Sequence, residues 1–392
     1  MNSTVRQKYL EVHDIGHIQI HYFPMSAFLH HILGQKSTSS WRCYWPHRII
    51  NEGKLGISVT SYKPMRRDAS FYAGFDAIRF PRQIGQKDLL FLRYLKKIQK
   101  ECGFKLVFDT DDLLLHDEIP PYNLCRQSFK GPESDARFLE FISLVDEVTV
   151  STPYLRDYLR SRTGKEEVSA LPNFIPYFWM GRYFDHSKVM HNFRKHLERP
   201  RIVYTGTKTH FDLGSSRAGY DDFTHITTFI TKNVRKYTFV FVGSYPPRIR
   251  DYVDKGDVEV HPQQDLASYP SFLSSLEAQL FIAPLMSNRF NRSKSDIKRI
   301  EAACLGVPCL SQDIEPYAGS PQSLLFNGAE DIEHKIELLL SDEKRYAEMS
   351  FALREEAESR FLEKKENIEL FLSFLTTPYG CRTRKHAIAP WT

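Results

Sequence analysis

The sequence lacks the marks of several protein classes. Its six cysteines are scattered without a C-x-x-C pair, which excludes a zinc ribbon and a disulfide framework and favours a reducing compartment. With only 19 glycines and 21 prolines in 392 residues, the chain is neither collagen-like nor wholly disordered. It has no dense basic block, since the net charge of +5 is spread along the chain. We therefore expect no nucleic-acid partner.

Long uncharged runs are also scarce. Residues 15–35 contain no Asp, Glu, Lys or Arg, but four histidines and Pro24 make this stretch unsuitable for a bilayer. Residues 1–14 lack the apolar core of a signal peptide. We expect a cytoplasmic protein without a transmembrane helix. The net charge and the basic residues 382–386 are compatible with peripheral contact with an anionic membrane face.

Short apolar runs alternate with helical patterns along most of the chain, which indicates parallel sheets built from βαβ units. The length of 392 residues favours two domains. In the first half we expect strands at 17–23, 56–61, 77–80, 105–109, 147–151 and 168–171. In the second half we expect them at 201–205, 238–242, 258–261, 279–284, 307–310 and 323–326. The fold class is thus α/β, with two Rossmann-like, doubly wound domains facing each other across a cleft.

Helical periodicity is clearest at 86–101, which should end at Gly103, and also marks 222–233, 296–305 and about 342–375. Periodicity is lost after residue 171, so we place a linker at 176–198. The expected domains are an N-terminal acceptor-side domain at 1–175 and a donor-binding domain at 199–340. Residues 341–392 should form C-terminal helices that pack back toward the first domain, followed by a basic tail.

The segment 283–308 carries the strongest chemical signal, because a strand, a loop and a helix follow one another directly. Ser293 or Ser295 could cap the helix, and Lys294, Lys298 and Glu301 would share one helical face. A helix N-terminus with lysines suits a diphosphate, and a carboxylate one turn later suits a ribose diol. The same spacing also fits an ordinary charged surface helix.

This segment, FNRSKSDIKRIEAACLGVPCLSQDIEPY, resembles the donor-binding element of the group 1 or GT4-like glycosyltransferases, which have the GT-B fold. Similar pieces occur at 145–154, 171–175 and 201–206, so the resemblance covers roughly 105–317. It implies transfer of a sugar from a nucleoside diphosphate sugar to a hydroxyl acceptor, with retention of configuration, in polysaccharide or glycoconjugate synthesis. The family's ribose-binding glutamate corresponds to Glu301. An earlier glutamate of many members is replaced here by Ser293, so contacts to the donor sugar must differ.

The candidate donor site follows from this resemblance and from the ends of neighbouring strands. It comprises Gly206, Thr207, Lys208, Gly243, Asn291, Arg292, Lys294, Ser295, Lys298 and Glu301. The lysines would stabilise the departing diphosphate, so no metal ion or other cofactor is expected. The partners are then a nucleotide sugar and a glycan or lipid-linked acceptor.

On the acceptor side, Asp109 and Asp111 follow an expected strand, and we predict a catalytic or acceptor-orienting role for them, with Lys294 as the third catalytic residue. Asx-type loop capping and a magnesium site are the alternatives. Trp41, Arg42 and Tyr44 form a candidate platform for an acceptor sugar; an aromatic core edge is the alternative explanation.

Three other functions remain open. A nucleotide-sugar epimerase would share the architecture. A non-catalytic double-Rossmann interaction protein would not need two lysines and a glutamate in this arrangement. The FDTDD stretch also resembles the nucleophile loop of haloacid-dehalogenase-type phosphatases, but Leu113 stands where Thr or Val is expected.

Overall fold

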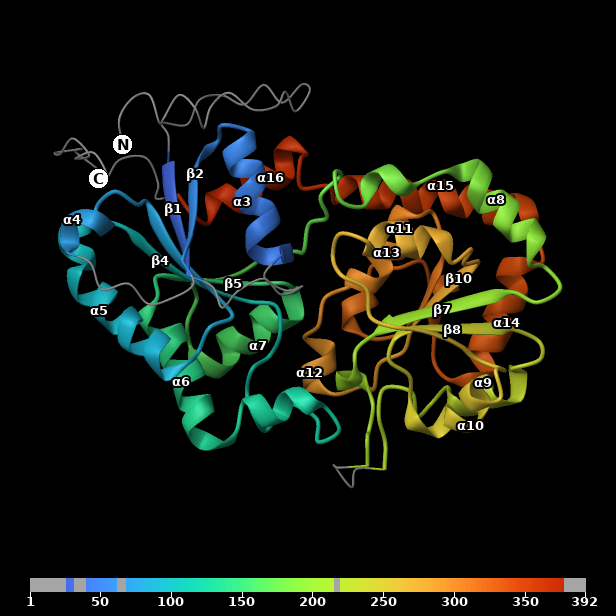
Figure 1. Ribbon diagram of the computed structural model, residues 1–392. Coiled ribbons are helices and arrows are strands. Elements are labelled where there is room, and N and C mark those ends of the chain that lie inside the picture. Colours follow the sequence, from blue (N-terminus) through green and yellow to red (C-terminus); the bar gives the residue numbers. More distant parts are fainter. Residues whose placement is uncertain (1–25, 32–39, 62–67, 215–218, 377–392) are drawn as a thin grey trace. The chain divides into compact units, whose positions relative to one another are not determined.

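The computed structural model describes residues 26–31, 40–61, 68–214 and 219–376 (Figure 1). The chain divides into two compact units, neither of which is a continuous stretch of sequence. Unit 1 contains the described parts of 1–112, 132–174 and 362–392, and unit 2 contains those of 113–131 and 175–361. In each unit helices flank a sheet of parallel strands (Figure 1).

Unit 1 has a six-stranded sheet in the order β2-β1-β3-β4-β5-β6. Its strands are β1 (Ser26–His31), β2 (Gly56–Ser61), β3 (Ala77–Pro81), β4 (Lys105–Thr110), β5 (Glu147–Val150) and β6 (Val168–Ala170). Its helices are α3 (Trp45–Glu52), α4 (Ala69–Tyr72), α5 (Gln86–Cys102), α6 (Gly131–Leu144), α7 (Pro153–Thr163) and α16 (Lys365–Ser373). The helix α5 ends at Gly103 in the left-handed region, with φ of 71°, as the sequence predicts.

Unit 2 has a second six-stranded sheet in the order β12-β11-β10-β7-β8-β9, which is the strand order of the Rossmann fold. Its strands are β7 (Arg201–Gly206), β8 (Thr238–Gly243), β9 (Glu259–His261), β10 (Leu280–Ala283), β11 (Cys309–Gln312) and β12 (Leu325–Phe326). Its helices are α8 (His186–Lys195), α9 (Thr227–Asn233), α10 (Arg250–Asp254), α11 (Tyr269–Ser275), α12 (Arg289–Arg292), α13 (Ile297–Cys304), α14 (Ala329–Leu340) and α15 (Glu343–Ser359).

Eleven of the twelve expected strands appear at their expected places, and the twelfth, at 17–23, lies outside the described residues. The boundaries of the two units differ from the expected domains. Residues 113–131 interrupt unit 1 but belong to unit 2. The expected linker at 176–198 also belongs to unit 2, because it forms the helix α8, whose buried Val189 and Phe193 pack with Tyr346 of α15.

The C-terminal region is likewise divided between the units. The single helical region expected at about 342–375 is broken between α15 in unit 2 and α16 in unit 1. The ring of Phe371 on α16 lies 5.2 Å from the guanidinium of the buried Arg79 on β3, which ties this last helix to the first sheet. The basic residues 382–386 lie outside the described residues.

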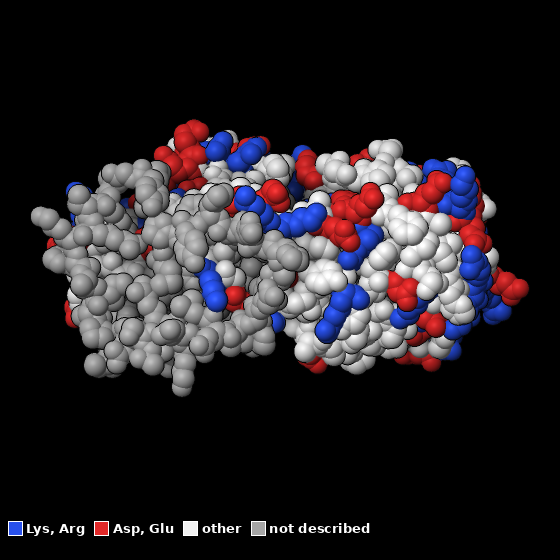
Figure 2. All heavy atoms as spheres, turned by 90° about the horizontal axis from the view of Figure 1, so that it is seen from above, with Lys and Arg blue, Asp and Glu red and all other residues white. Residues whose placement is uncertain are grey.

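Charged side chains of both signs are interspersed over the described part of the face in Figure 2. No helix in the described part of the chain is both long and apolar enough to span a bilayer.

Candidate functional site

The order of the strands in unit 2 reverses between β7 and β10, which lie side by side in the sheet. In open α/β sheets, ligands bind outside the carboxyl ends of the strands at such a switch point. The segments that follow these two strands carry His210, Asn291 and Lys294, and α13 adds Lys298 and Glu301. The topology therefore brings the predicted donor residues to the edge where a ligand is expected.

Asp222 is the buried centre of this edge, with 1% of its surface exposed. Its carboxylate accepts hydrogen bonds from Tyr122 Oη at 2.6 Å, His210 Nδ1 at 2.7 Å, Asn291 Nδ2 at 2.7 Å and the backbone nitrogen of Met286 at 3.0 Å. Burial alone would raise its pKa, but the hydrogen bonds from His210 and Tyr122 and the charge of Lys294 lower the pKa below the usual value. Asp222 is therefore ionised, and every donor around it is oriented by its charge.

His210 connects this carboxylate to a lysine. Its Nε2 lies 3.5 Å from Lys298 Nζ, at the outer limit of hydrogen-bond distance. Burial, together with the charges of Lys294 and Lys298, lowers the pKa of His210 to about 3, so the ring is neutral. Because the ionised Asp222 can only accept, Nδ1 carries the proton, and the lone pair of Nε2 faces Lys298.

Lys298 is half-buried, and its Nζ lies 5.5 Å from the centre of the Tyr204 ring. Burial and the neighbouring charge of Lys294 lower the pKa of Lys298 to about 8. The ammonium thus remains charged at neutral pH. A bound anion would offset the repulsion between the two lysines. Two neighbouring ammonium groups that repel each other in the free protein are expected of a diphosphate site.

Glu301 lies one helical turn beyond Lys298 and is 7% exposed. Its Oε2 accepts a hydrogen bond from Tyr269 Oη at 2.9 Å, and no other side chain in the described residues bonds to it. Burial raises the pKa of Glu301 to about 7, against the opposing effects of Tyr269 and Lys298. Trp179 stacks on the Tyr269 ring at 6.0 Å and an angle of 13°. The carboxylate is thus held by one donor and has further capacity to accept.

The structure corrects one expectation for Lys294. The helix α13 begins at Ile297, so Lys294 lies in the turn before it and does not share its face. Asp296, rather than Ser293 or Ser295, occupies the N-cap position, and its carboxylate is paired with Arg299 at 2.6 Å and with Arg360 at 3.3 Å. Lys294 nevertheless influences the site through its charge on His210.

The predicted glycines end two neighbouring strands. Gly206 of β7 pairs with Gly243 of β8, and Gly243 has φ of 95°. A Cβ atom on Gly243 would lie 2.5 Å from the Gly206 carbonyl oxygen, and one on Gly206 would collide with the Tyr204 hydroxyl. Packing within unit 2 therefore requires both glycines, independently of any ligand.

The other four predicted positions are exposed or half-buried. Thr207 and Lys208 are exposed in the turn after β7. Arg292 donates from Nε to Glu315 at 2.6 Å. Ser295 is half-buried beside Lys294. Asn291, in contrast, is fully buried and bonded to Asp222, Tyr122 and the Met286 carbonyl oxygen, so it supports the site from inside.

Ser293, which replaces the earlier glutamate of the resembled family, is fully buried. Its hydroxyl donates to the Arg289 carbonyl oxygen at 2.8 Å. The side chain is therefore engaged with the preceding turn, α12, and does not offer a substitute for the missing carboxylate.

In unit 1, the predicted catalytic Asp109 is 1% exposed at the end of β4. Its carboxylate is paired with Arg42 Nη2 at 2.5 Å and Arg79 Nη2 at 2.7 Å, and it accepts from Thr149 Oγ1 at 2.6 Å. Although burial opposes ionisation, the two arginines lower the pKa of Asp109 to about 2. These contacts occupy the carboxylate inside unit 1, so the structure gives Asp109 a structural place in the fold.

The proposed aromatic platform is also mostly interior. Trp41 is 5% and Arg42 is 3% exposed, and the Trp41 ring packs edge-on against Trp45 at 5.0 Å. Arg42 further donates to the Leu171 carbonyl oxygen at 2.6 Å. Trp41 and Arg42 thus belong to the core edge, which was the alternative explanation, while Tyr44 is half-buried.

Asp111 has different surroundings from Asp109. It is 8% exposed and shares the guanidinium of Arg82 with Asp112, at distances of 3.2 Å and 2.8 Å. Burial raises the pKa of Asp111 to about 6. Of the two predicted aspartates, Asp111 is the one whose protonation can change near neutral pH.

Sequence reasoning missed His210, Asp222, Tyr269 and Tyr122. His210 lies in the segment after β7, two residues beyond the predicted Lys208, and its position close to a strand end was the available signal. Nothing in the sequence links it to Asp222, twelve residues later, or to Tyr122. Within the described residues, no three His, Cys, Asp or Glu side chains gather as a metal-binding group.

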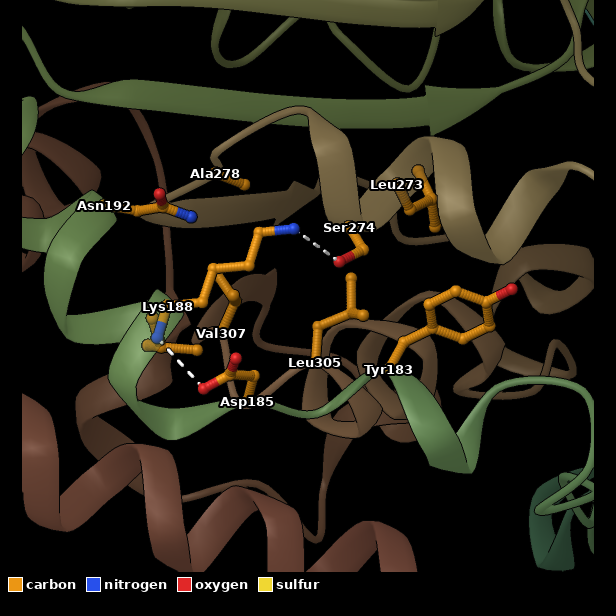
Figure 3. A pocket seen from close by; sticks show the side chains of 10 residues that line it. Tyr183, Asp185, Lys188, Asn192, Leu273, Ser274, Ala278, Leu305 and Val307 are labelled. Carbon is orange, nitrogen blue, oxygen red and sulfur yellow. Dashed lines mark hydrogen bonds between the residues drawn. The ribbon is translucent and has the colours of Figure 1, made fainter.

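Figure 3 shows a pocket of unit 2. It is lined by Tyr183, Asp185, Lys188, Val189, Asn192, Leu273, Ser274, Ala278, Leu305 and Val307. Several of these residues precede β10 and β11, so the pocket lies at the amino ends of those strands. Its volume of about 20 Å³ accommodates roughly one water molecule, which is too small for a nucleotide sugar.

Comparison with known proteins identifies the fold. No family model and no curated protein matches the sequence. Anabaena HepE in complex with UDP and glucose matches with a TM-score of 0.57 and 10% identity over 89% of this chain and 99% of that one. A glycosyltransferase from Rickettsia africae matches with 0.57 and 11% over 90% and 99%. An α-glucosyltransferase in complex with UDP-glucose and abasic DNA matches with 0.53 and 11% over 90% and 100%.

At these identities the similarity shows the fold alone. The two doubly wound units are those of the GT-B fold, and this expectation from the sequence is confirmed.

Proposed function

We propose that this chain is a glycosyltransferase that moves a sugar from a nucleoside diphosphate sugar to a hydroxyl acceptor. The observation that carries the proposal is the grouping of Lys294, Lys298 and Glu301 at the switch point of the second sheet. HepE, which has the same fold, is described in complex with UDP and with UDP-glucose, and we take uridine diphosphate sugars as the first donors to test.

Each of these side chains has a distinct role in the proposal. Lys294 and Lys298 neutralise the diphosphate that departs, and Glu301 accepts hydrogen bonds from the ribose hydroxyls in its ionised form. In the reaction, the bond between the sugar C1 and the phosphate oxygen breaks and a bond from C1 to the acceptor oxygen forms. The nucleoside diphosphate and the acceptor proton are released. The lysines perform the charge stabilisation, so the proposal includes no metal ion.

The finer parts of the proposal follow from the resemblance of the sequence to the group 1 or GT4-like glycosyltransferases. The anomeric configuration is retained, and the acceptor is a glycan or lipid-linked sugar of polysaccharide or glycoconjugate synthesis. The protein acts in the cytoplasm, with peripheral contact to an anionic membrane face. Asp111 is the residue of unit 1 best suited to orient an acceptor hydroxyl, since its pKa of about 6 allows both protonation states.

The test is calorimetric titration with UDP and a panel of other nucleoside diphosphates. Glu301→Gln should weaken nucleotide binding ten- to a hundredfold, because a charge-assisted bond contributes about 1.5–3 kcal/mol. Glu330→Gln, an exposed change at the start of α14, is the matched control and should bind as the wild type does. Equal affinity of wild type and Glu301→Gln would contradict the donor site.

Two activity measurements separate the proposal from its alternatives. Turnover of the nucleotide sugar with an acceptor should survive treatment with a chelator. Loss of turnover that magnesium restores would move the diphosphate to a metal site. Conversion of the nucleotide sugar into its epimer without an acceptor, followed by NMR, would instead identify an epimerase.

A further inference from the structure

Two buried side chains at the switch point, His210 and Asp222, have no role in the function proposed above. They are 8% and 1% exposed. His210 lies between Asp222 on one side and Lys298 on the other, at 2.7 Å and 3.5 Å. The Tyr204 ring packs against the imidazole at 6.4 Å and an angle of 86°. The imidazole is thus fixed at both nitrogens and on one side.

We propose that His210 is a positioning residue that holds the Lys298 ammonium at the diphosphate site, with Asp222 fixing the imidazole in the tautomer that accepts at Nε2. This inference rests on the proposed function, because it assumes that Lys298 meets a nucleoside diphosphate. It adds a buried Asp-His-Lys relay, in which only the lysine touches the ligand.

The donors to Asp222 are divided between its two oxygens. Tyr122 Oη, Asn291 Nδ2 and the Met286 backbone nitrogen donate to Oδ1, and His210 Nδ1 bonds to Oδ2. None of them is a cation, so the negative charge of Asp222 is not cancelled by an ion pair and polarises the imidazole. A polarised imidazole is a stronger acceptor at Nε2 for the Lys298 ammonium.

The relay matters because Lys298 is otherwise poorly held. The charged and titratable groups that face it are Lys294, which repels it, Asp222 and Glu301, which attract it, and the Cys309 thiol. Burial raises the pKa of Cys309 to about 11, so this thiol is uncharged at neutral pH. Among the described residues it has no carboxylate ion pair within 4 Å, and His210 Nε2 is its hydrogen-bond acceptor. Without this acceptor, the flexible side chain would lose entropy only on binding its ligand.

The test is a double-mutant cycle read by UDP titration. His210→Asn retains an amide that can donate to Asp222 but has no atom in place of Nε2, and Lys298→Met removes the ammonium. We expect each single variant to lose about tenfold or more in affinity, and the double variant to be no weaker than Lys298→Met alone. Additive losses would overturn the inference, because a purely structural His210 would act independently of the lysine.

Two further variants keep the inference testable if His210→Asn folds poorly. His210→Gln can place a carboxamide oxygen near the position of Nε2, and it should recover most of the lost affinity. The exposed His225→Asn in the same unit is the control and should bind UDP normally. Failure of Gln to bind better than Asn, with both proteins folded by circular dichroism, would count against the acceptor role.

The pH profile gives an independent reading. Wild-type affinity for UDP should fall as the pH rises through about 8, where the free Lys298 loses its proton. In His210→Asn the fall should begin at a lower pH, since the ammonium has lost an acceptor. An unchanged profile would contradict the relay. If the wild type binds no nucleoside diphosphate at any pH, the proposed function itself fails, which is a distinguishable result.

Discussion

Unit 1 and unit 2 each bury an aspartate beside the carboxyl ends of their parallel strands, and they neutralise it by different means. Asp109 is paired with two arginines, which are permanent cations, and one hydroxyl. Asp222 is surrounded by a hydroxyl, an amide, a backbone nitrogen and a neutral imidazole. Both carboxylates have lowered pKa values. The direction of the pKa shift alone therefore does not distinguish an aspartate that only stabilises its unit from one beside the proposed donor site.

The two aspartates differ in whether a cation neutralises their charge. In unit 1, Arg42 and Arg79 neutralise the charge of Asp109, and these three side chains form an internal clamp that holds the fold together. In unit 2 the neutral donors stabilise the charge of Asp222 without cancelling it, so it still acts on the lysines nearby. Glu301 is a third case, since a single hydroxyl donor leaves its pKa at about 7. Substitutions of Asp109, of Glu301 and of Tyr122, which donates to Asp222, test this comparison.

The largest effect is expected at Asp109. Asp109→Asn leaves Arg42 and Arg79 buried without a counter-charge and should lower the free energy of unfolding by about 3–5 kcal/mol. The surface pair of Arg156 and Asp157 is the control: Asp157→Asn should cost less than about 0.5 kcal/mol. Urea unfolding measures both. A small loss in Asp109→Asn would show that the clamp does not stabilise unit 1.

The same contact predicts acid sensitivity. The folded pKa of Asp109 is depressed to about 2, so its contribution is present above the unfolded value near 4 and is lost as the pH falls toward 2. Wild type should lose stability in this window, and Asp109→Asn should lose less.

An intermediate effect is expected at Glu301, with the opposite sign. Its folded pKa is raised, so the stability of the free protein is fully present below about 4.5 and falls as the pH rises through about 7. Glu301→Gln removes this penalty and should be more stable than the wild type at pH 8.5, by on the order of 1–3 kcal/mol. Thermal unfolding without nucleotide at pH 5 and pH 8.5 measures the difference. If the difference in stability between Glu301→Gln and wild type is the same at pH 5 and at pH 8.5, the carboxylate of Glu301 is well solvated.

The smallest effect is expected at Tyr122. Tyr122→Phe removes one of four donors to Asp222 and should cost about 1 kcal/mol of stability and a few-fold of UDP affinity. Tyr220, whose ring contacts the Tyr122 ring edge-on at 5.8 Å, supplies the control: Tyr220→Phe keeps the ring and should change neither quantity. If Tyr122→Phe loses as much affinity as His210→Asn, the loss in His210→Asn reflects its support of Asp222 and not an acceptor role toward Lys298.

The sequence predicted the sheets well, because short apolar runs bounded by turns are a local signal. The strands at 105–109 and 201–205 are confirmed almost to the residue, and Gly103 ends α5 as expected. Lys298 and Glu301 also fall where predicted, since both lie on the short helix after a strand and a loop. Their meeting with Lys294 depends on a turn that periodicity does not describe.

The rest depended on contacts between distant parts of the chain. The run SSWRCYWP has the same composition whether it presents its rings to a sugar or to the core, and only burial shows that Trp41 and Arg42 are interior. Asp109 has no sequence neighbour that identifies Arg42 and Arg79 as its partners. The relay through His210 likewise combines segments that are 12 and 88 residues apart.

The passage of residues 113–131 into unit 2 has a consequence for recombining this protein with others of its fold. Unit 2 exchanged as a single block from residue 175 to 361 would leave behind Tyr122, whose hydroxyl bonds to Asp222, and it would also leave behind Glu118, which pairs with Arg289 at 3.0 Å. An exchange of this block alone therefore joins residues 175–361 of one protein to residues 113–131 of another. Viable exchanges of unit 2 should include residues 113–131 as well, because the contacts within the unit, and not the order of the chain, decide which segments must be exchanged together.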